Sequence, residues 1–302
     1  GDAPGISLDG LGVDRVLIVE PGYDVEVSDL TMTNGFGWQL AGCVLNNGVL
    51  TLDHVTVTGC VMATDAGDFW QGGGGIYSGD GATLNLLDST VSNNTAGWSG
   101  GGVYGFFNTT TVIESSTISG NVSGDVGGGI RSLGNAEIVN STISGNEATG
   151  WYGGAMFVTD GVVNLLNTTV ADNTSPVWAP ADVFVGTFGP SSATLSMTNT
   201  IVSSLQNNCF VAYFGAGAVT LATDHNNVFT DATCFAGPSD QVVADALLGP
   251  LADNGGPTQT HALLGGSPAL DAADAAACPA TDQRGVTRPQ GAGCDVGAFE
   301  LE

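Results

Sequence analysis

The sequence Gly100-Gly101-Gly102-Val103-Tyr104 decides the fold, because the chain repeats this glycine-led strand at a nearly constant spacing. The copies occupy residues 73–77, 100–104, 127–131, 153–157 and 181–184. Their central apolar residues, which lie 27, 27, 26 and 27 positions apart, are Ile76, Val103, Ile130, Met156 and Val183. A fixed period of this length, made of strands, is typical of a solenoid. Since each coil of a solenoid contacts only its neighbours, we expect residues 1–245 to form one elongated body.

A second motif, an asparagine that follows an apolar strand, has the same period. The asparagines are 27, 25 and 27 residues apart, at Asn94, Asn121, Asn146 and Asn173. Asparagine tolerates the left-handed backbone of a corner, and its amide can bond the same residue in the next coil. Because a third apolar stretch precedes each motif, the pattern has three strands per coil. It predicts an all-β, right-handed parallel β-helix of about nine coils with an irregular C-terminal cap.

The charge of the chain excludes one class of partner. The sequence has no lysine and four arginines against 30 acidic residues, which gives a net charge of −26. Nucleic acid is therefore not an expected partner, since binding to its backbone requires clustered cations. We expect no membrane-spanning segment and no cofactor. Calcium is the weaker alternative, because isolated Gly-Asp corners such as Asp68, Asp80 and Asp125 are more often turns than ligands.

The cysteines indicate the compartment. The six cysteines form three local pairs with spacings of 17, 25 and 16, namely Cys43 and Cys60, Cys209 and Cys234, and Cys278 and Cys294. The sequence alone leaves the connectivity open, but the spacings favour pairing between neighbours. An even number of cysteines in an acidic chain that lacks lysine favours disulfides, and hence a secreted or cell-surface protein. The first ten residues look like the middle of a strand-rich region and not like its beginning, so we expect a mature or trimmed form of the protein.

The C-terminal region carries a family resemblance. It reads Leu247-Leu-Gly-Pro-Leu-Ala-Asp-Asn-Gly-Gly-Pro-Thr-Gln-Thr-His261, then Asp282-Gln-Arg-Gly-Val-Thr-Arg-Pro-Gln290 and Cys294-Asp-Val-Gly-Ala-Phe-Glu300. These stretches resemble the choice-of-anchor Q surface proteins of bacteria, which are similar to parallel β-helices of the pectate-lyase-like superfamily. The repeats are also similar to those of polymorphic outer-membrane proteins. The resemblance covers nearly the whole chain and implies an exported bacterial surface protein, but it implies no particular activity.

Residues 246–302 are expected to form a capping region packed on the last coils. The open end of a solenoid exposes unpaired strand groups, which a cap can cover. Arg284 and Arg288 lie close in sequence to Asp282 and Asp295, and we expect ion pairs among them, because the arginine fork suits carboxylates. His261 is expected to be a structural hydrogen-bonding group in the same region.

Aromatic residues are predicted to line one outer face of the coils. If Ile76 points inward, the next residue of each strand points outward. The predicted outward stripe is Tyr77, Tyr104, Arg131, Phe157 and Phe184, and it is flanked by Trp38, Trp70, Trp98, Trp151 and Trp178. The tryptophans could cover a corner as a stacked ladder. The alternatives are a sugar-binding platform and a contact surface for a protein or membrane.

Two functions follow from this face, and a purely structural stalk that binds no glycan is the third hypothesis. The first is a surface scaffold or adhesin whose partner is a polysaccharide, bound as a neutral glycan along the aromatic residues, or another surface protein. The second is a polysaccharide lyase or glycoside hydrolase, with Arg131, Tyr104, Asp125 and Glu147 as candidate catalytic residues. A hydrolase needs two opposed carboxylates, but Asp68, Asp125, Glu147 and Asp160 have no spacing that singles out a pair. Asp53-His54 and Asp224-His225 are not expected to form dyads, because adjacent strand residues point to opposite faces.

Overall fold

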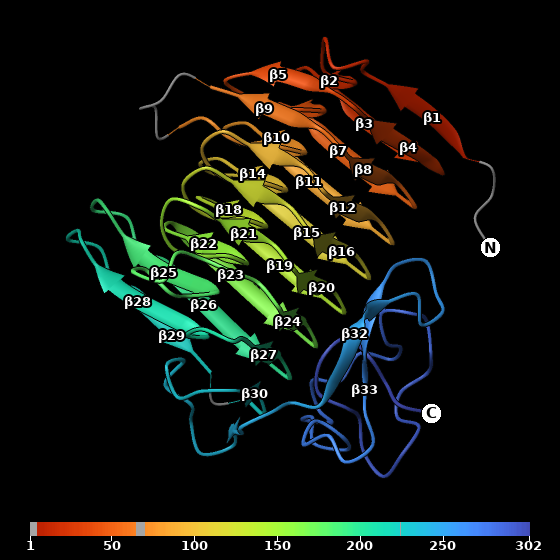
Figure 1. Ribbon diagram of the computed structural model, residues 1–302, viewed down its shortest axis with the longest axis vertical. Helices are drawn as coiled ribbons and strands as arrows, with labels where there is room; N and C mark the ends of the chain where they lie inside the picture. Colours follow the sequence, from red (N-terminus) through yellow and green to blue (C-terminus); the bar gives the residue numbers. More distant parts are fainter. Residues whose placement is uncertain (1–4, 65–69, 224) are drawn as a thin grey trace.

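The computed structural model describes residues 5–64, 70–223 and 225–302, and within them the chain forms strands and no helix. Figure 1 shows a stack of parallel coils, with the C-terminal residues (blue) beside the stack. The predicted fold class, an all-β parallel β-helix with three main strands per coil, is confirmed. The stack has about eight coils, slightly fewer than the nine expected.

Three long sheets and one short sheet form the stack, and we name them A to D. Sheet A has ten strands: β1 (Ile6–Asp9), β4 (Leu30–Thr33), β8 (Thr56–Thr58), β12 (Thr90–Ser92), β16 (Thr117–Ser119), β20 (Thr142–Ser144), β24 (Thr169–Ala171), β27 (Ile201–Ser203), β30 (Val228–Phe229) and β31 (Gln241–Val242). Sheet B has eight: β2 (Leu17–Val19), β6 (Val44–Asn46), β10 (Ile76–Ser78), β14 (Val103–Gly105), β18 (Ile130–Ser132), β22 (Met156–Val158), β25 (Val183–Thr187) and β28 (Cys209–Tyr213).

Sheets C and D complete the coils. Sheet C has eight strands: β3 (Asp24–Ser28), β7 (Val49–Asp53), β11 (Thr83–Leu87), β15 (Thr110–Glu114), β19 (Asn135–Val139), β23 (Gly161–Leu166), β26 (Ala193–Thr198) and β29 (Val219–Ala222). Sheet D has five: β5 (Phe36–Trp38), β9 (Val61–Ala63), β13 (Thr95–Ala96), β17 (Val122–Ser123) and β21 (Glu147–Ala148). Of these four sheets, only sheet A gains strands after β29, so the chain completes no further coil there.

The central residues of the glycine-led strands align inside the stack, as the period predicts. Ile76 pairs with Val103, Val103 with Ile130, Ile130 with Met156, and Met156 with Val183. All five are buried in one apolar core that runs through the coils. Three residues before four of these strands, a glycine has positive φ, where a side chain would cause strain: Gly73, Gly100, Gly127 and Gly153. The repeat therefore encodes both the inner column and the corner before it.

The asparagine ladder also forms. The Nδ2 of Asn94 donates to Oδ1 of Asn121 at 3.0 Å, and the next two steps, to Asn146 and Asn173, are 2.9 Å each. The prediction that these asparagines adopt the left-handed conformation was wrong. That conformation falls on the residue before each of them, at Asn93, Gly120, Gly145 and Asp172. The corner is turned one residue earlier, and the ladder side chains point into the stack, where they are buried.

The C-terminal segment lies along the outer face of sheet A. The antiparallel pair β32 (Leu248–Ala252) and β33 (Thr260–Leu263) stands beside this sheet in Figure 1. Thr142 donates to Oε1 of Gln283 at 2.6 Å, and Nε2 of His261 lies 2.8 Å from Oγ of Ser144. Further contacts reach from Thr117 in β16 to Asn199 before β27. The segment thus covers the flank of several coils, because the outward hydroxyls of sheet A need partners there.

Ion pairs hold the segment together, with one partner that differs from the expected one. Arg284 pairs with Asp282 at 2.8 Å, as predicted. Arg288 pairs with Glu300 at 3.4 Å and not with the carboxylate of Asp295. The Asp295 carboxylate instead accepts the backbone N–H groups of Asp271 and Leu301, while Arg288 donates to the Asp295 carbonyl oxygen.

Three disulfides join the predicted neighbours: Cys43–Cys60, Cys209–Cys234 and Cys278–Cys294. The first two lie in the core of the stack, and the third lies in the C-terminal segment. As for membranes, the described residues contain no helix that is long and apolar enough to cross one.

Candidate functional site

A cleft on the outside of sheet B arises from unequal turns between sheets B and C. Two residues separate β18 from β19, and two separate β22 from β23. In the coil above, residues 106–109 separate β14 from β15, and in the coil below, residues 188–192 separate β25 from β26. The two short turns leave a hollow between the longer ones. We call this hollow the aromatic cleft.

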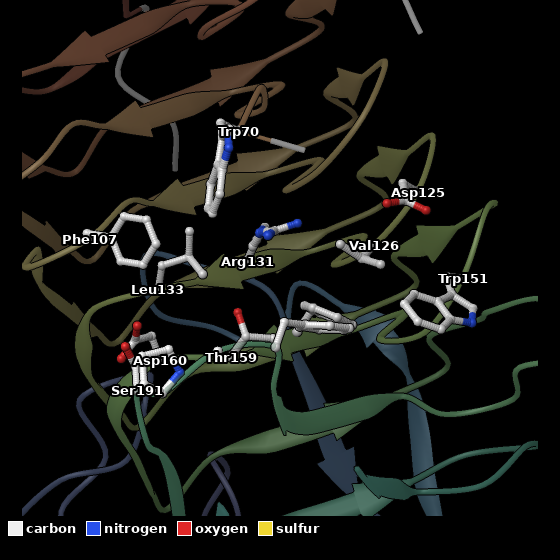
Figure 2. Close-up of a pocket in the computed structure, with 14 residues that line it drawn as sticks. Trp70, Phe107, Asp125, Val126, Arg131, Leu133, Trp151, Thr159, Asp160 and Ser191 are labelled. Carbon is white, nitrogen blue, oxygen red and sulfur yellow. The ribbon is translucent and has the colours of Figure 1, made fainter. Parts of the chain in front are cut away.

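The aromatic cleft has a volume of about 700 Å³ and is lined mainly by apolar side chains. Trp70 and Phe107 line it from the coils above, and Trp151 and Phe188 line it from those below. The remaining side chains that line it are Arg131, Leu133, Phe157, Val126 and Thr159, with Asp125, Asp160 and Ser191 at its ends. Figure 2 shows Arg131 near the middle, with Trp70 on one side, Thr159 on the other, and Asp125 and Asp160 far apart. A smaller hollow of about 250 Å³ continues from it past Phe107 and Asp160.

The wall above the cleft is a cluster of interlocked rings. Trp70 contacts Phe106 edge-on at 5.8 Å and Phe107 at 5.4 Å between ring centroids. Behind them, Tyr104 contacts Tyr77 at 5.1 Å and Phe106 at 6.1 Å. Edge-to-face contacts of this kind add to the energy of apolar burial and fix ring orientation. The wall is therefore preformed.

The wall below the cleft is a stack of nearly parallel rings. The ring centroids of Phe157 and Phe184 are 4.2 Å apart. Phe188 continues the stack, and its centroid lies 5.1 Å from that of Phe214. Trp151 packs against this stack, with its ring centroid 5.9 Å from that of Phe214 and 6.0 Å from that of Phe188. Phe188 is half exposed, so its face is open to a ligand. Flat, exposed aromatic faces suit the apolar faces of sugar rings.

Arg131 lies between the two walls. It pairs in register with Tyr104 above and Phe157 below. Its guanidinium carbon lies 5.2 Å from the Tyr104 ring centroid and 5.6 Å from that of Phe157, within the range of cation–π interactions. Its Nη1 donates to Oγ of Ser99 at 2.8 Å. The side chain is buried, and these contacts hold it in one orientation.

Asp125 lies at one end of the cleft. Burial raises the pKa of its carboxyl group above the ordinary value, and the positive charge of Arg131 opposes that rise. The carboxyl group therefore keeps its proton to a higher pH than an exposed aspartate. Asp160 lies at the opposite end, where its carboxylate accepts the backbone N–H of Gly161.

The cleft brings together some of the residues proposed from the sequence. Trp70, Trp151, Phe157, Arg131 and Asp125 line it, as does the hydrolase candidate Asp160. The outward direction of the stripe is borne out by ring clusters separate from the inner core, but its side chains are not open to solvent. Those that lie beneath the walls are Tyr77, Tyr104 and Phe184, each 5% exposed or less. Loops and neighbouring rings cover them, which alternation within a strand does not reveal.

The other candidate residues lie away from the cleft. Its lining does not include Trp38, Trp98, Trp178 or Glu147. Trp178 is 67% exposed in the loop that precedes β25, and Glu147 belongs to sheet D. The candidate Asp68 and the Asp224 of the second Asp-His pair lie outside the described residues.

The turn residues that complete the cleft do not follow from the repeat. Phe107, Phe188 and Thr159 belong to turns whose lengths vary between coils, so the period does not place them. The aromatic residues share one feature in the sequence: Phe107, Phe188 and Phe214 stand one or two positions after strands of sheet B that end at Gly105, Thr187 and Tyr213. A search for aromatic residues just after each sheet B strand would have found them.

Asp53 and His54 interact, contrary to the expectation from strand geometry. Nδ1 of His54 lies 2.6 Å from Oδ1 of Asp53, because His54 has a φ of 54° at a corner and is not part of a strand. This interaction raises the pKa of His54. Together with Asp88, the two side chains could reach one metal ion, but exposed acidic groups often cluster without one.

Comparison with known proteins gives no relative for this chain: no protein-family model matches it, and no curated protein or solved structure is significantly similar to it.

Proposed function

We propose that the chain is a secreted or cell-surface scaffold or adhesin that binds a polysaccharide in the aromatic cleft. The observation that carries the proposal is the pair of aromatic walls on opposite sides of the cleft, which has a volume of about 700 Å³. Trp70 in one wall and Phe188 in the other are both half exposed. Sugars present apolar faces that stack on such rings, and sites of this size hold small ligands. Three disulfides support an oxidising, extracellular setting. The resemblance to choice-of-anchor Q surface proteins points to the same setting.

The aromatic cleft is a better candidate than the exposed tryptophans. A ligand in the cleft contacts rings on two sides and is partly withdrawn from water. Trp38 and Trp178 are 50% and 67% exposed and lie outside the cleft, so a ligand there would stack on one ring only. Binding along the whole length of the stack is also disfavoured, because Tyr77, Tyr104 and Phe184 lie beneath other side chains.

A glycan array followed by calorimetric titration tests the proposal. Trp151→Ala and Phe188→Ala are each expected to weaken binding roughly tenfold, which corresponds to about 1.4 kcal/mol. Trp178→Ala is the matched control, because it removes an exposed tryptophan outside the cleft. An equal loss in all three variants, or no binding to any glycan, would contradict the proposal.

The alternative is an enzyme that cleaves a polysaccharide in the same cleft. The observation that favours it is Asp125, whose pKa is raised by burial beside the positive charge of Arg131. A general acid needs such a raised pKa. Release of reducing ends, or absorbance of an unsaturated product at about 235 nm, together with loss of turnover in Asp125→Asn, would establish the enzyme. Binding of the polysaccharide without turnover would favour the scaffold or adhesin over the enzyme.

A further inference from the structure

Arg131 differs from the other buried arginines in its lack of a carboxylate partner. Arg284 and Arg288 pair with Asp282 and Glu300 at 2.8 and 3.4 Å. No carboxylate of the described residues lies within ion-pair distance of Arg131, although its side chain is only 6% exposed. Buried charges in proteins are normally paired, because their removal from water is costly. Among the described residues, Asp125 acts on Arg131 only from beyond ion-pair distance, so the cleft side of the guanidinium suits a negatively charged group.

Two further atoms at the cleft lack hydrogen-bond partners. Among the described residues, neither Nε of Arg131 nor Oγ1 of Thr159 has a partner, and both atoms are buried. Thr159 is 6% exposed, and both residues line the cleft. A buried polar group that stays unpaired typically costs about 1–3 kcal/mol. Figure 2 shows the Thr159 hydroxyl pointing up towards the region of Arg131.

The geometry around Arg131 suits a planar anion. The rings of Tyr104 and Phe157 hold the guanidinium between them, and Ser99 anchors one of its nitrogen atoms. A guanidinium fixed in this way presents a rigid fork that matches a carboxylate. Interactions of this kind are also stronger in a partly desolvated cleft than in water.

The charges around the cleft limit the ligand to one anionic group. Asp125 and Asp160 stand at its two ends, and the chain carries a net charge of −26. A second carboxylate on either side of the first would approach one of these aspartates without a cation to offset it, since Arg131 is the single arginine among the described residues of the lining. Doubly charged phosphate groups are disfavoured for the same reason.

We propose that the cleft binds a saccharide with a single carboxylate, an acidic sugar residue flanked by neutral ones, and that Arg131 receives this carboxylate. The hydroxyl of Thr159 donates a hydrogen bond to the same residue of the ligand. Neutral neighbours of the acidic sugar stack on Trp70 and Phe107 or on Trp151 and Phe188. This inference rests on the proposed carbohydrate binding and names its ligand class.

The test compares two ligands that differ at one carbon. An oligosaccharide with one uronic acid residue between neutral sugars is titrated by calorimetry, and so is its carboxyl-reduced counterpart, in which the carboxylate is a primary alcohol. The unaltered protein is expected to bind the acid at least tenfold more tightly. Arg131→Gln should abolish this difference, because the acid and its reduced counterpart then meet the same uncharged side chain. Thr159→Val, which keeps the shape of the side chain, should weaken acid binding by a smaller factor.

Each outcome bears on a different claim. Equal affinity of the unaltered protein for both ligands would overturn the carboxylate assignment and leave carbohydrate binding intact. Binding of neither ligand, when the glycan array is also negative, would overturn both proposals. A polyuronate that binds more tightly than the singly charged ligand would contradict the limit set by Asp125 and Asp160. The comparison of ligands on the unaltered protein does not depend on the folding of any variant.

Discussion

The side-chain amide of Asn121 donates to Oδ1 of Asn146 at 2.9 Å, one coil away in the stack. The backbone N–H of Asn121 donates to the same oxygen at 3.0 Å. Asn121 in turn accepts both the backbone and side-chain N–H groups of Asn94. Each asparagine thus closes its own corner and fixes the height of the next coil, so the ladder is a structural element of the β-helix.

Asn121→Ala is expected to lower the free energy of unfolding by about 2–3 kcal/mol, since it leaves buried donors of Asn94 without an acceptor and opens a small cavity. Asn93→Gly is the control. Asn93 is exposed and has a φ of 55°, which glycine adopts without strain, so this change should have little effect. Chemical denaturation of both variants checks the prediction. Equal stability of the two would contradict the structural role of the ladder.

Removal of the Cys43–Cys60 disulfide should destabilise the first coils. The bond closes a loop with a sequence separation of 17 and lies in the inner core. A loop of this size corresponds to about 3 kcal/mol in the chain-entropy model. The double variant Cys43→Ala, Cys60→Ala is therefore expected to have a lower melting temperature than the unaltered chain. A reducing agent should lower the melting temperature of the variant by less than that of the unaltered chain, because the variant has one disulfide fewer to lose. An unchanged melting temperature would contradict the prediction.

Stability should depend on pH through Asp182. This residue is fully buried, and its burial raises its pKa well above the ordinary 3.8, with the charges of Asp172 and Asp231 acting in the same direction. The folded state therefore holds the proton more tightly than the unfolded state. The free energy of unfolding therefore falls as the pH rises from 3.8 through the raised pKa. The loss is about 1.4 kcal/mol for each pH unit between the pKa values of the unfolded and folded states.

Asp182→Asn removes this titration. The variant is expected to be more stable than the unaltered chain near pH 7, and its melting temperature should vary less between pH 4 and 7. Thermal melts across this range provide the measurement. Identical pH profiles for the two proteins would show that the pKa of Asp182 is not raised in the folded state.

Gln283 should fasten the C-terminal segment to sheet A. Its Nε2 donates to Thr117 and Thr258, and its Oε1 accepts the hydroxyl of Thr142. Gln283→Ala removes these bonds in a buried position, with an expected cost of about 1–3 kcal/mol. Hydrogen exchange should rise in β33 and β20, whereas the exposed control Gln290→Ala should leave both unchanged. Faster exchange confined to residues 283–290 would contradict this role.

The repeat predicts those parts of the fold that depend on register. The inner column from Ile76 to Val183 and the asparagine ladder both follow from it, because a coil of nearly constant length places like residues above one another. The disulfides follow from local spacing. The position of the C-terminal segment could not be predicted, because its contacts, such as that between Thr142 and Gln283, join residues 141 positions apart with no shared pattern.

The cleft was only partly predictable. Arg131 interrupts an aromatic column, and this break is visible in the sequence. Whether the rings around it are exposed depends on turn length and on which rings cover which, and Phe107 and Phe188 enter the site from turns of different lengths. Strand alternation gives the direction of a side chain relative to the core, but it does not give the cover supplied by loops.

A crystal structure of the chain with a bound oligosaccharide would test carbohydrate binding in the aromatic cleft without relying on any variant. We expect the sugar to lie in the aromatic cleft, between Phe107 on one side and Trp151 and Phe188 on the other, with its nearest polar group at Arg131. A sugar bound elsewhere, for example at Trp178 or along sheet A, with the cleft empty, would contradict it.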